Sequence, residues 1–192
     1  MKRLRREFNA AIRETAGDWL GHLKFIDEFG VHLGLTRLYG RAAPGQRVVE
    51  ATPGYSGAHY TVVAALGLEG ISAPWVFEGA TSSLAFETYV ERILVPTLHA
   101  GDLVLIDNLS AHKAAPITAW IERCGARLHF LPPYSPDWNP IELCWAKVKA
   151  ALRDAKARTF DALVDALCAA LQAIDPADVL AWFAHCGYAV QP

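Results

Sequence analysis

Between residues 25 and 77, short apolar runs alternate with turns that contain glycine or proline. The runs cover residues 25–33, 46–50, 60–68 and 71–77. Runs of this length, bounded by Gly and Pro, are typical of strands, and short connections between them favour antiparallel pairing. The first part of the chain therefore predicts antiparallel strands.

The pattern changes after Gly79 to strands that alternate with helices. Residues 103–106 are continuously apolar, which is typical of a strand buried on both faces. The other segments, helical or extended by their spacing, are a helix over 84–94, a helix capped by Ser110 and running to residue 121, a strand over 127–131, and helices over 141–152, 160–174 and 176–185. This order predicts an α/β mixed sheet with flanking helices and a helical C-terminus, preceded by an amphipathic helix over residues 2–20.

Composition narrows the class of protein. A length of 192 residues, 53% of them hydrophobic, fits one domain with a well-buried core. No run approaches about 18 apolar residues and the basic start is not followed by a signal core, so we expect a cytoplasmic protein without a membrane span. The net charge of -2 argues against a protein that coats nucleic acid by charge alone, and the four scattered cysteines predict reduced thiols.

Two aspartates occupy positions in predicted buried structure that suggest a function for their carboxylates. Strand alternation places Asp27 on the face shared by Phe25, Phe29 and Val31, where burial is costly without compensation, although an edge-strand acid that reaches solvent is the alternative. Asp107 follows a buried strand, at the end where α/β sheets place ligand chemistry. Its alternative is an ordinary turn residue.

A third acid, Glu142, has two competing interpretations. The sequence from Asn139 to Glu142 has the spacing of a capping box, in which the glutamate only closes the start of a helix. Alternatively, Glu142 shares an outward helix face with Lys149 and Arg153, which suits a polyanionic partner. Carboxylates brought together repel one another, and Mg²⁺ or Mn²⁺ is the kind of cation that such hard oxygen ligands hold.

Four segments of the chain resemble the catalytic domain of DDE transposases of the mariner-like superfamily, in the branch found in bacterial insertion sequences. The gap of 34 residues between Asp107 and Glu142 (142 − 107 − 1) also resembles the family pattern. The segments are residues 25–28 (FIDE), 36–41 (TRLYGR), 105–113 (LIDNLSAHK) and 131–142 (LPPYSPDWNPIE).

The resemblance implies a ribonuclease H-like fold, with three antiparallel strands and then parallel strands. It divides the chain into an N-terminal helix or linker remnant, 1–22, and a catalytic domain, 23–192. It also implies that Asp27, Asp107 and Glu142 are catalytic and hold two Mg²⁺ or Mn²⁺ ions. Activated water would cleave DNA at the element's ends, and the freed 3′-hydroxyl would attack target DNA.

Further side chains are candidates for supporting or DNA-contacting roles. Asn108 and His112 follow Asp107 and could orient a ligand or contact phosphate, although His112 could equally be an ordinary residue of the first helical turn. Arg37 and Arg41 lie near the first strand connection and could clamp phosphates, as Lys149 and Arg153 could on their helix. The alternatives are an ordinary polar hairpin for the first pair and a solvated helix face for the second.

The chain departs from the family pattern in two places. Phe29 stands where relatives carry a small polar residue, and the residues before the first strand are too few for the helix-turn-helix modules that recognise element ends. We therefore expect a truncated copy, a fragment or half of a split gene, with a separate or missing recognition module, DNA as partner, a homodimer, and nucleoid association in a bacterial cell. The alternatives are an inactive remnant that serves as a dimerisation module and a stand-alone nuclease of the same fold.

Overall fold

The computed structural model describes residue 8, residues 19–108 and residues 115–188. The helix predicted over residues 2–20 lies almost entirely outside this part of the chain. The predicted cap Ser110 and the candidate His112 also lie outside it.

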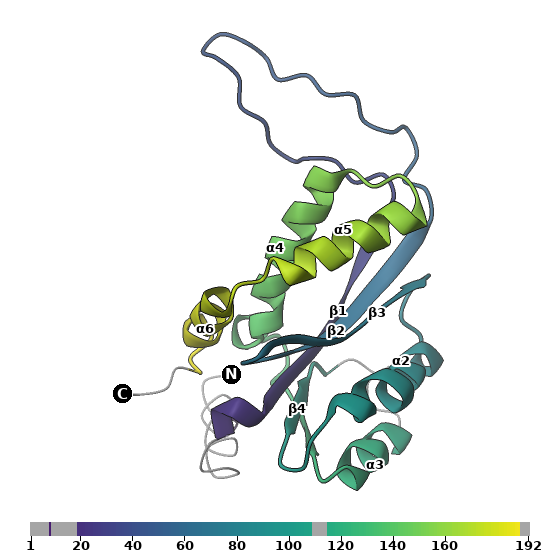
Figure 1. The fold of residues 1–192 in the computed structure, drawn as a ribbon, viewed down its shortest axis with the longest axis vertical. Coiled ribbons are helices and arrows are strands. Elements are labelled where there is room, and N and C mark those ends of the chain that lie inside the picture. Colours follow the sequence, from purple (N-terminus) through teal and green to yellow (C-terminus); the bar gives the residue numbers. More distant parts are fainter. Residues whose placement is uncertain (1–7, 9–18, 109–114, 189–192) are drawn as a thin grey trace.

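A five-stranded mixed sheet forms the centre of the molecule (Figure 1). The strands are β1 (Leu23–His32), β2 (His59–Gly67), β3 (Gly70–Glu78), β4 (Leu103–Ile106) and β5 (Arg127–Phe130), in the order β3-β2-β1-β4-β5. β1, β2 and β3 pair antiparallel, whereas β1, β4 and β5 pair parallel. The predicted succession of three antiparallel strands and then parallel strands is confirmed.

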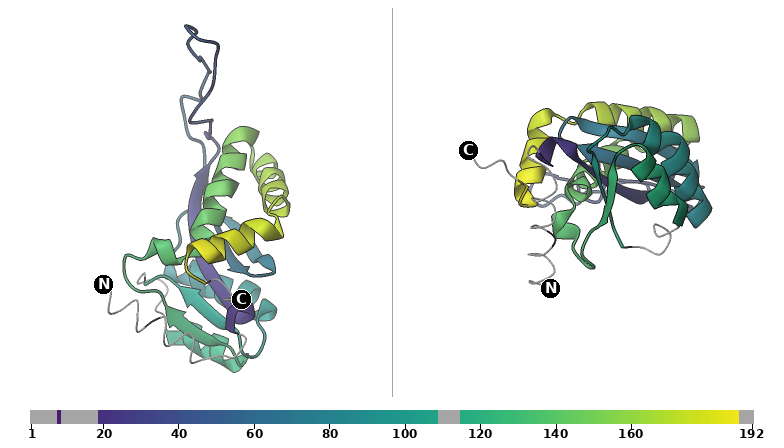
Figure 2. Two further views of the ribbon diagram at one scale, coloured as in Figure 1. Left: turned by 90° about the vertical axis from the view of Figure 1, so that its left-hand side faces the viewer. Right: turned by 90° about the horizontal axis from the view of Figure 1, so that it is seen from below.

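Helices cover both faces of this sheet. They are η1 (Trp19–His22), α2 (Ser83–Tyr89), η2 (Val90–Leu94), η3 (Val95–Thr97), α3 (Ala115–Arg123), η5 (Pro136–Trp138), α4 (Pro140–Ala155), α5 (Phe160–Gln172) and α6 (Pro176–His185). Helices α4, α5 and α6 pack on one face, and α2, η2 and α3 pack on the other (Figures 1 and 2). No helix in the described ranges is long and apolar enough to cross a bilayer.

Side-chain alternation along β1 and β4 explains the two layers. Phe25 and Leu105 join the core beneath α4, α5 and α6, while Ile26 and Ile106 join the core beneath α2 and α3. All four residues of β4 are buried, as the continuous apolar run predicted. Both faces of the sheet at β4 are therefore shielded from water, so a polar side chain that points from either face there needs compensation.

The strand predicted over residues 46–50 is wrong. Residues 33–58 form one long connection from β1 to β2, which projects from the sheet as an extended arm (Figures 1 and 2). Residues 37–55 are exposed throughout, so the apolar Val48 and Val49 have no core to cover. Two strands that pair with each other alone, without a further strand or a helix to pack against, are at best marginally stable.

The base of this arm is held by the helical layer. The Nη1 atom of Arg158 donates to the carbonyl oxygens of Leu33 and Leu35, each at 2.9 Å. Lys156, which caps the C-terminus of α4, forms an ion pair with Glu50. The arm is therefore attached to the end of α4 that lies away from Glu142.

The helix predicted over residues 84–94 divides into α2 and the π-helical η2. The hydroxyl of Ser82 caps α2 by accepting from the backbone N–H of Ala85 at 3.2 Å. The wider turn keeps Tyr89, Val90 and Leu94 buried. Apolar spacing predicted the buried face but could not distinguish α from π geometry.

Behind α6, a buried tyrosine fastens the C-terminal end to the segment before α4. The ring of Tyr188 lies 5.1 Å from the ring of Phe25, and its hydroxyl donates to the carbonyl oxygen of Trp138 at 2.8 Å. Burial raises the pKa of the Tyr188 phenol, so this donor keeps its proton at ordinary pH. The hydrogen bond from Tyr188 thereby fixes the connection from η5 to α4.

Replacing Trp145 tests how α4 is held on the sheet. Trp145 is fully buried and its ring lies 4.8 Å from that of Phe29 on β1. Trp145→Ala should lower the free energy of unfolding by about 3–5 kcal/mol, because a large buried side chain leaves a cavity. Chemical denaturation measures this change, with Leu180→Ala on the exposed face of α6 as control. Equal stabilities of the two variants would contradict the packing described.

Candidate active site

Strand register places two of the three predicted acids after paired residues of neighbouring strands. Ile26 on β1 is the parallel partner of Ile106 on β4, and both point into the layer beneath α2 and α3. Asp27 and Asp107 each follow one residue later. Because successive side chains alternate between faces, the two carboxylates start from the opposite face of the sheet, beneath α4.

Glu142 approaches the same face from the first turn of α4. The capping-box alternative is wrong, since the side chain of Asn139 makes no cap hydrogen bond and its backbone N–H donates instead to the carbonyl oxygen of Pro136 at 3.0 Å. Helix α4 begins with Pro140, whose missing N–H leaves one fewer donor to satisfy. The Glu142 carboxylate is therefore not used to close its own helix.

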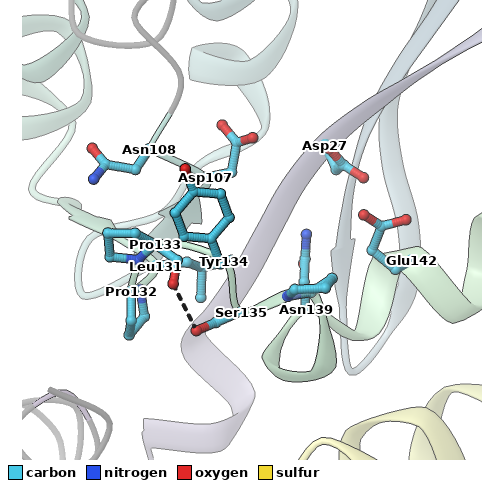
Figure 3. Close-up of a pocket in the computed structure, with 11 residues that line it drawn as sticks. Asp27, Asp107, Asn108, Leu131, Pro132, Pro133, Tyr134, Ser135, Asn139 and Glu142 are labelled. Carbon is cyan, nitrogen blue, oxygen red and sulfur yellow. Dashed lines mark hydrogen bonds between the residues drawn. The ribbon is translucent and has the colours of Figure 1, made fainter. Parts of the chain in front are cut away.

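The three carboxylates line one cleft with a volume of about 380 Å³. In Figure 3, Asp27 and Glu142 lie on one side of this cleft and Asp107 on the other. The remaining lining residues are Asn108, Leu131, Pro132, Pro133, Tyr134, Ser135, Pro136 and Asn139. None of these residues is a lysine or arginine, so the described lining holds three acids and no cation.

Asp27 shows the electrostatic consequence of this arrangement. Burial is the largest cause that raises the pKa of its carboxyl from 3.8 to about 8. The nearby Glu142, Glu28 and Asp107 add to this rise, and one backbone hydrogen bond opposes it. Ala64 of β2, the antiparallel partner of Asp27, is too small to offer a compensating group. The site therefore favours either a proton or a cation at Asp27.

Carboxylate oxygens are the ligands that Mg²⁺ and Mn²⁺ prefer, so the chemistry of the three acids fits a divalent ion. As the side chains stand, no three acidic, histidine or cysteine residues in the described ranges are close enough together to enclose an ion. Asp107 lies across the cleft from the other two acids (Figure 3). An ion shared by all three requires Asp107 to approach Asp27 and Glu142.

The other candidates separate into those near the cleft and those away from it. Asn108 is exposed and lines the cleft beside Asp107. Lys149 and Arg153 follow along α4 toward the arm and do not line the cleft. The ammonium of Lys149 lies 5.1 Å from the ring centre of Phe29, which gives this unusual phenylalanine a cationic partner.

Arg37 and Arg41 are not brought to the cleft, because both lie on the arm. Arg37 donates from Nε to Oδ1 of Asp154 at 2.6 Å, and both side chains are more than half exposed. Arg41 is exposed, and it has no ion pair within the described part of the chain. The arm therefore offers cations at a distance from the acids.

Sequence reasoning gave no role to Tyr134 and Ser135, and gave Asn139 only that of a helix cap, although all three residues line one wall of the cleft. Ser135 and Asn139 are buried, while Tyr134 is 90% exposed. The available signal was their place in the chain, because residues 131–139 connect the carboxyl end of β5 to α4. In mixed sheets such connections surround the ligand site.

Comparison with known proteins gives both a family and a fold. A family model described as DDE superfamily endonuclease matches residues 22–164. A comparison with curated protein sequences finds no match.

Among solved structures, the chain is similar to a pre-cleavage Mos1 transpososome, with a TM-score of 0.70 and 15% identity over 93% of this chain and 56% of that one. It is also similar to the catalytic domain of Mos1 mariner transposase, with a TM-score of 0.64 and 14% identity over 93% of this chain and 82% of that one. The chain thus spans little more than half the length of the transposase in the transpososome.

These similarities confirm the expected ribonuclease H-like arrangement of the sheet and helices. The matched residues, 22–164, include all three acids of the cleft and cover more than half of the chain. This chain belongs to the DDE superfamily of endonucleases.

Proposed function

We propose that this chain is the catalytic domain of a mariner-like transposase, which cleaves DNA strands and joins the freed ends to target DNA. The observation that carries the proposal is the meeting of Asp27, Asp107 and Glu142 at one cleft, in a member of an endonuclease family. The structural likeness to Mos1 in a strand transfer complex supports the same chemistry.

In this proposal the three carboxylates hold two Mg²⁺ or Mn²⁺ ions. Such ions, when bound, activate an attacking oxygen and stabilise the leaving oxygen of a phosphodiester. Similar Mos1 structures are described with Mg and with Mn, which supports the choice of metal. Within this chain, Asp27 must lose its proton to act as a ligand, and the buried sheet face keeps its carboxylate directed into the cleft.

The proposal extends to partners and to domain boundaries. Mos1 structures are described as paired-end complexes with transposon ends, which supports DNA as substrate and a homodimer as the working assembly. We place the catalytic domain at residues 23–192, close to the matched 22–164, with recognition of element ends supplied by a helix-turn-helix module. Assignment to the bacterial insertion-sequence branch, with cytoplasmic and nucleoid-associated residence, is part of the same proposal.

Substitution of each acid tests the catalytic assignment. Asp27→Ala, Asp107→Ala and Glu142→Ala should each abolish Mn²⁺-dependent nicking of supercoiled plasmid, because each removes a metal ligand. Circular dichroism should show an unchanged fold, and Glu122→Ala, at an exposed acid on α3, is the control. A variant that still nicks removes its residue from the site. Joining of a pre-cleaved DNA end to a target distinguishes a transposase from a simple nuclease.

Asp27→Asn should alter stability in a pH-dependent way in metal-free protein. The folded pKa of about 8 exceeds the ordinary 3.8, so the folded chain keeps a proton that the unfolded chain releases. Wild-type stability is therefore fully present below about pH 4 and falls as pH rises toward about 8. At pH 8 the variant should be more stable than wild type by a few kcal/mol, since one pKa unit is about 1.4 kcal/mol.

Urea denaturation in EDTA at pH 4 and pH 8 measures this difference. Asp165→Asn, at an exposed acid on α5, removes the same charge elsewhere and should follow wild type. Mn²⁺ added at pH 8 should stabilise wild type and leave Asp27→Asn unchanged. Equal stability of wild type and Asp27→Asn at pH 8 in EDTA would show that Asp27 carries no such penalty.

The two arginines of the arm should differ in DNA binding. Arg41→Ala should lower the slope of log affinity against log salt concentration by about 0.9, the value for one phosphate contact on duplex DNA. Arg37→Ala should have a smaller effect, because Asp154 already offsets the Arg37 charge. Fluorescence anisotropy with a labelled duplex measures both slopes, with the exposed Arg92→Ala on η2 as control. An Arg41→Ala slope equal to that of the control would exclude the arm as a phosphate contact.

A further inference from the structure

Tyr134 is an unusually exposed aromatic residue for one that lines a catalytic cleft. Its side chain is 90% exposed, and it lies in the same cleft wall as Ser135 and Asn139. Figure 3 shows its ring on the side of Asp107 rather than on the side of Asp27 and Glu142. Within the described residues, no other aromatic ring contacts it and its hydroxyl has no hydrogen bond. Packing of the core therefore does not explain the presence of a tyrosine here.

The backbone at Tyr134 is held in a conformation that favours glycine. Its φ of 55° lies in the left-handed region, which is costly for a residue with a bulky side chain. In the described ranges, two other non-glycine residues share a positive φ, namely Ala73 at the irregular pairing of β3 and Lys156 at the C-terminus of α4. Tyr134 has neither of these local reasons.

The neighbouring residues fix this strained turn. Pro132, Pro133 and Pro136 restrict the backbone on both sides. Ser135 is buried, and its Oγ donates to the carbonyl oxygen of Pro133 at 3.4 Å. A strained residue that its surroundings hold in place is characteristic of functional sites. The turn presents the tyrosine ring to solvent in one fixed position.

We propose that Tyr134 is a stacking platform for an unpaired nucleobase next to the phosphodiester that is cut. This inference rests on the proposed function, because the acids of the cleft must first place a phosphodiester there. A planar ring at the edge of such a cleft lies where the base of an adjoining nucleotide must go. Every base has a π face, so stacking tolerates any sequence. Opening of the duplex beside the cut would then be compensated at Tyr134.

Substitutions at Tyr134 separate stacking from a structural role. Tyr134→Ala should lower kcat/KM for nicking of a defined duplex by about 5- to 150-fold, the equivalent of about 1–3 kcal/mol per stacked base. Tyr134→Phe should retain activity, because the ring and not the hydroxyl does the stacking. Tyr134→Gly should lose as much activity as Tyr134→Ala while melting at the same temperature as wild type or higher, since glycine relieves the positive φ.

An abasic substrate gives the decisive comparison. The duplex is cut with wild type in Mn²⁺, the nick is mapped, and a tetrahydrofuran residue replaces the nucleotide on each side in turn. On one of the two abasic duplexes, wild type and Tyr134→Ala should react at the same rate. A Tyr134→Ala defect of equal size on the intact duplex and on both abasic duplexes would overturn the stacking proposal, as would full activity of Tyr134→Ala on the intact duplex.

Failure of the proposed function gives a different result. Nicking that persists in Asp107→Ala and Glu142→Ala would overturn the catalytic assignment. If those two variants are inactive while Tyr134→Ala equals wild type, the catalytic assignment stands and the stacking proposal alone is overturned. Wild type without any Mn²⁺-dependent nicking would overturn both.

Discussion

The parallel pairing of β1 with β4 is the constraint on which the site depends. With Ile26 beside Ile106, the acids that follow them leave the same sheet face and line one cleft with Glu142 of α4. A slip of one residue in either strand would send one carboxylate to the opposite face and an isoleucine into the cleft. The dry layers on both sides of the sheet oppose such a slip, because it would exchange buried apolar side chains for charged ones.

The same constraint concentrates negative charge, and the fold places its cations elsewhere. The described lining of the cleft has no lysine or arginine, while Lys149 and Arg153 lie farther along α4 and Arg41 lies on the arm. A polyanion bound to this chain would therefore be held along α4 and the arm, and metal would neutralise the acids. This division would allow a chain with a net charge of -2 to hold the DNA substrate that we propose.

Sequence patterns predicted most where burial decides structure. The run 103–106 and the helix Pro176–His185 were predicted at their observed bounds, because apolar periodicity reports the faces that are buried. The strand predicted over residues 46–50 of the arm was wrong, because Val48 and Val49 are apolar without being buried. Asp27 could be placed from strand alternation and Asp107 from the end of a buried strand. Tyr134 could not be placed, because its role depends on a backbone angle and on exposure that no periodicity encodes.

The hydrogen bond from Tyr188 to the carbonyl of Trp138 links the order of synthesis to the completion of the site. A growing chain that has left the ribosome only as far as α4 already contains all three acids, but the residue that fixes the cleft wall from behind is still 33 positions away (188 − 155). The two layers of the sheet can assemble before that point, whereas the cleft wall is secured only at the end. The last fixation of the cleft wall therefore depends on Tyr188, and a chain interrupted after α4 would contain the wall residues without the hydrogen bond that fixes them.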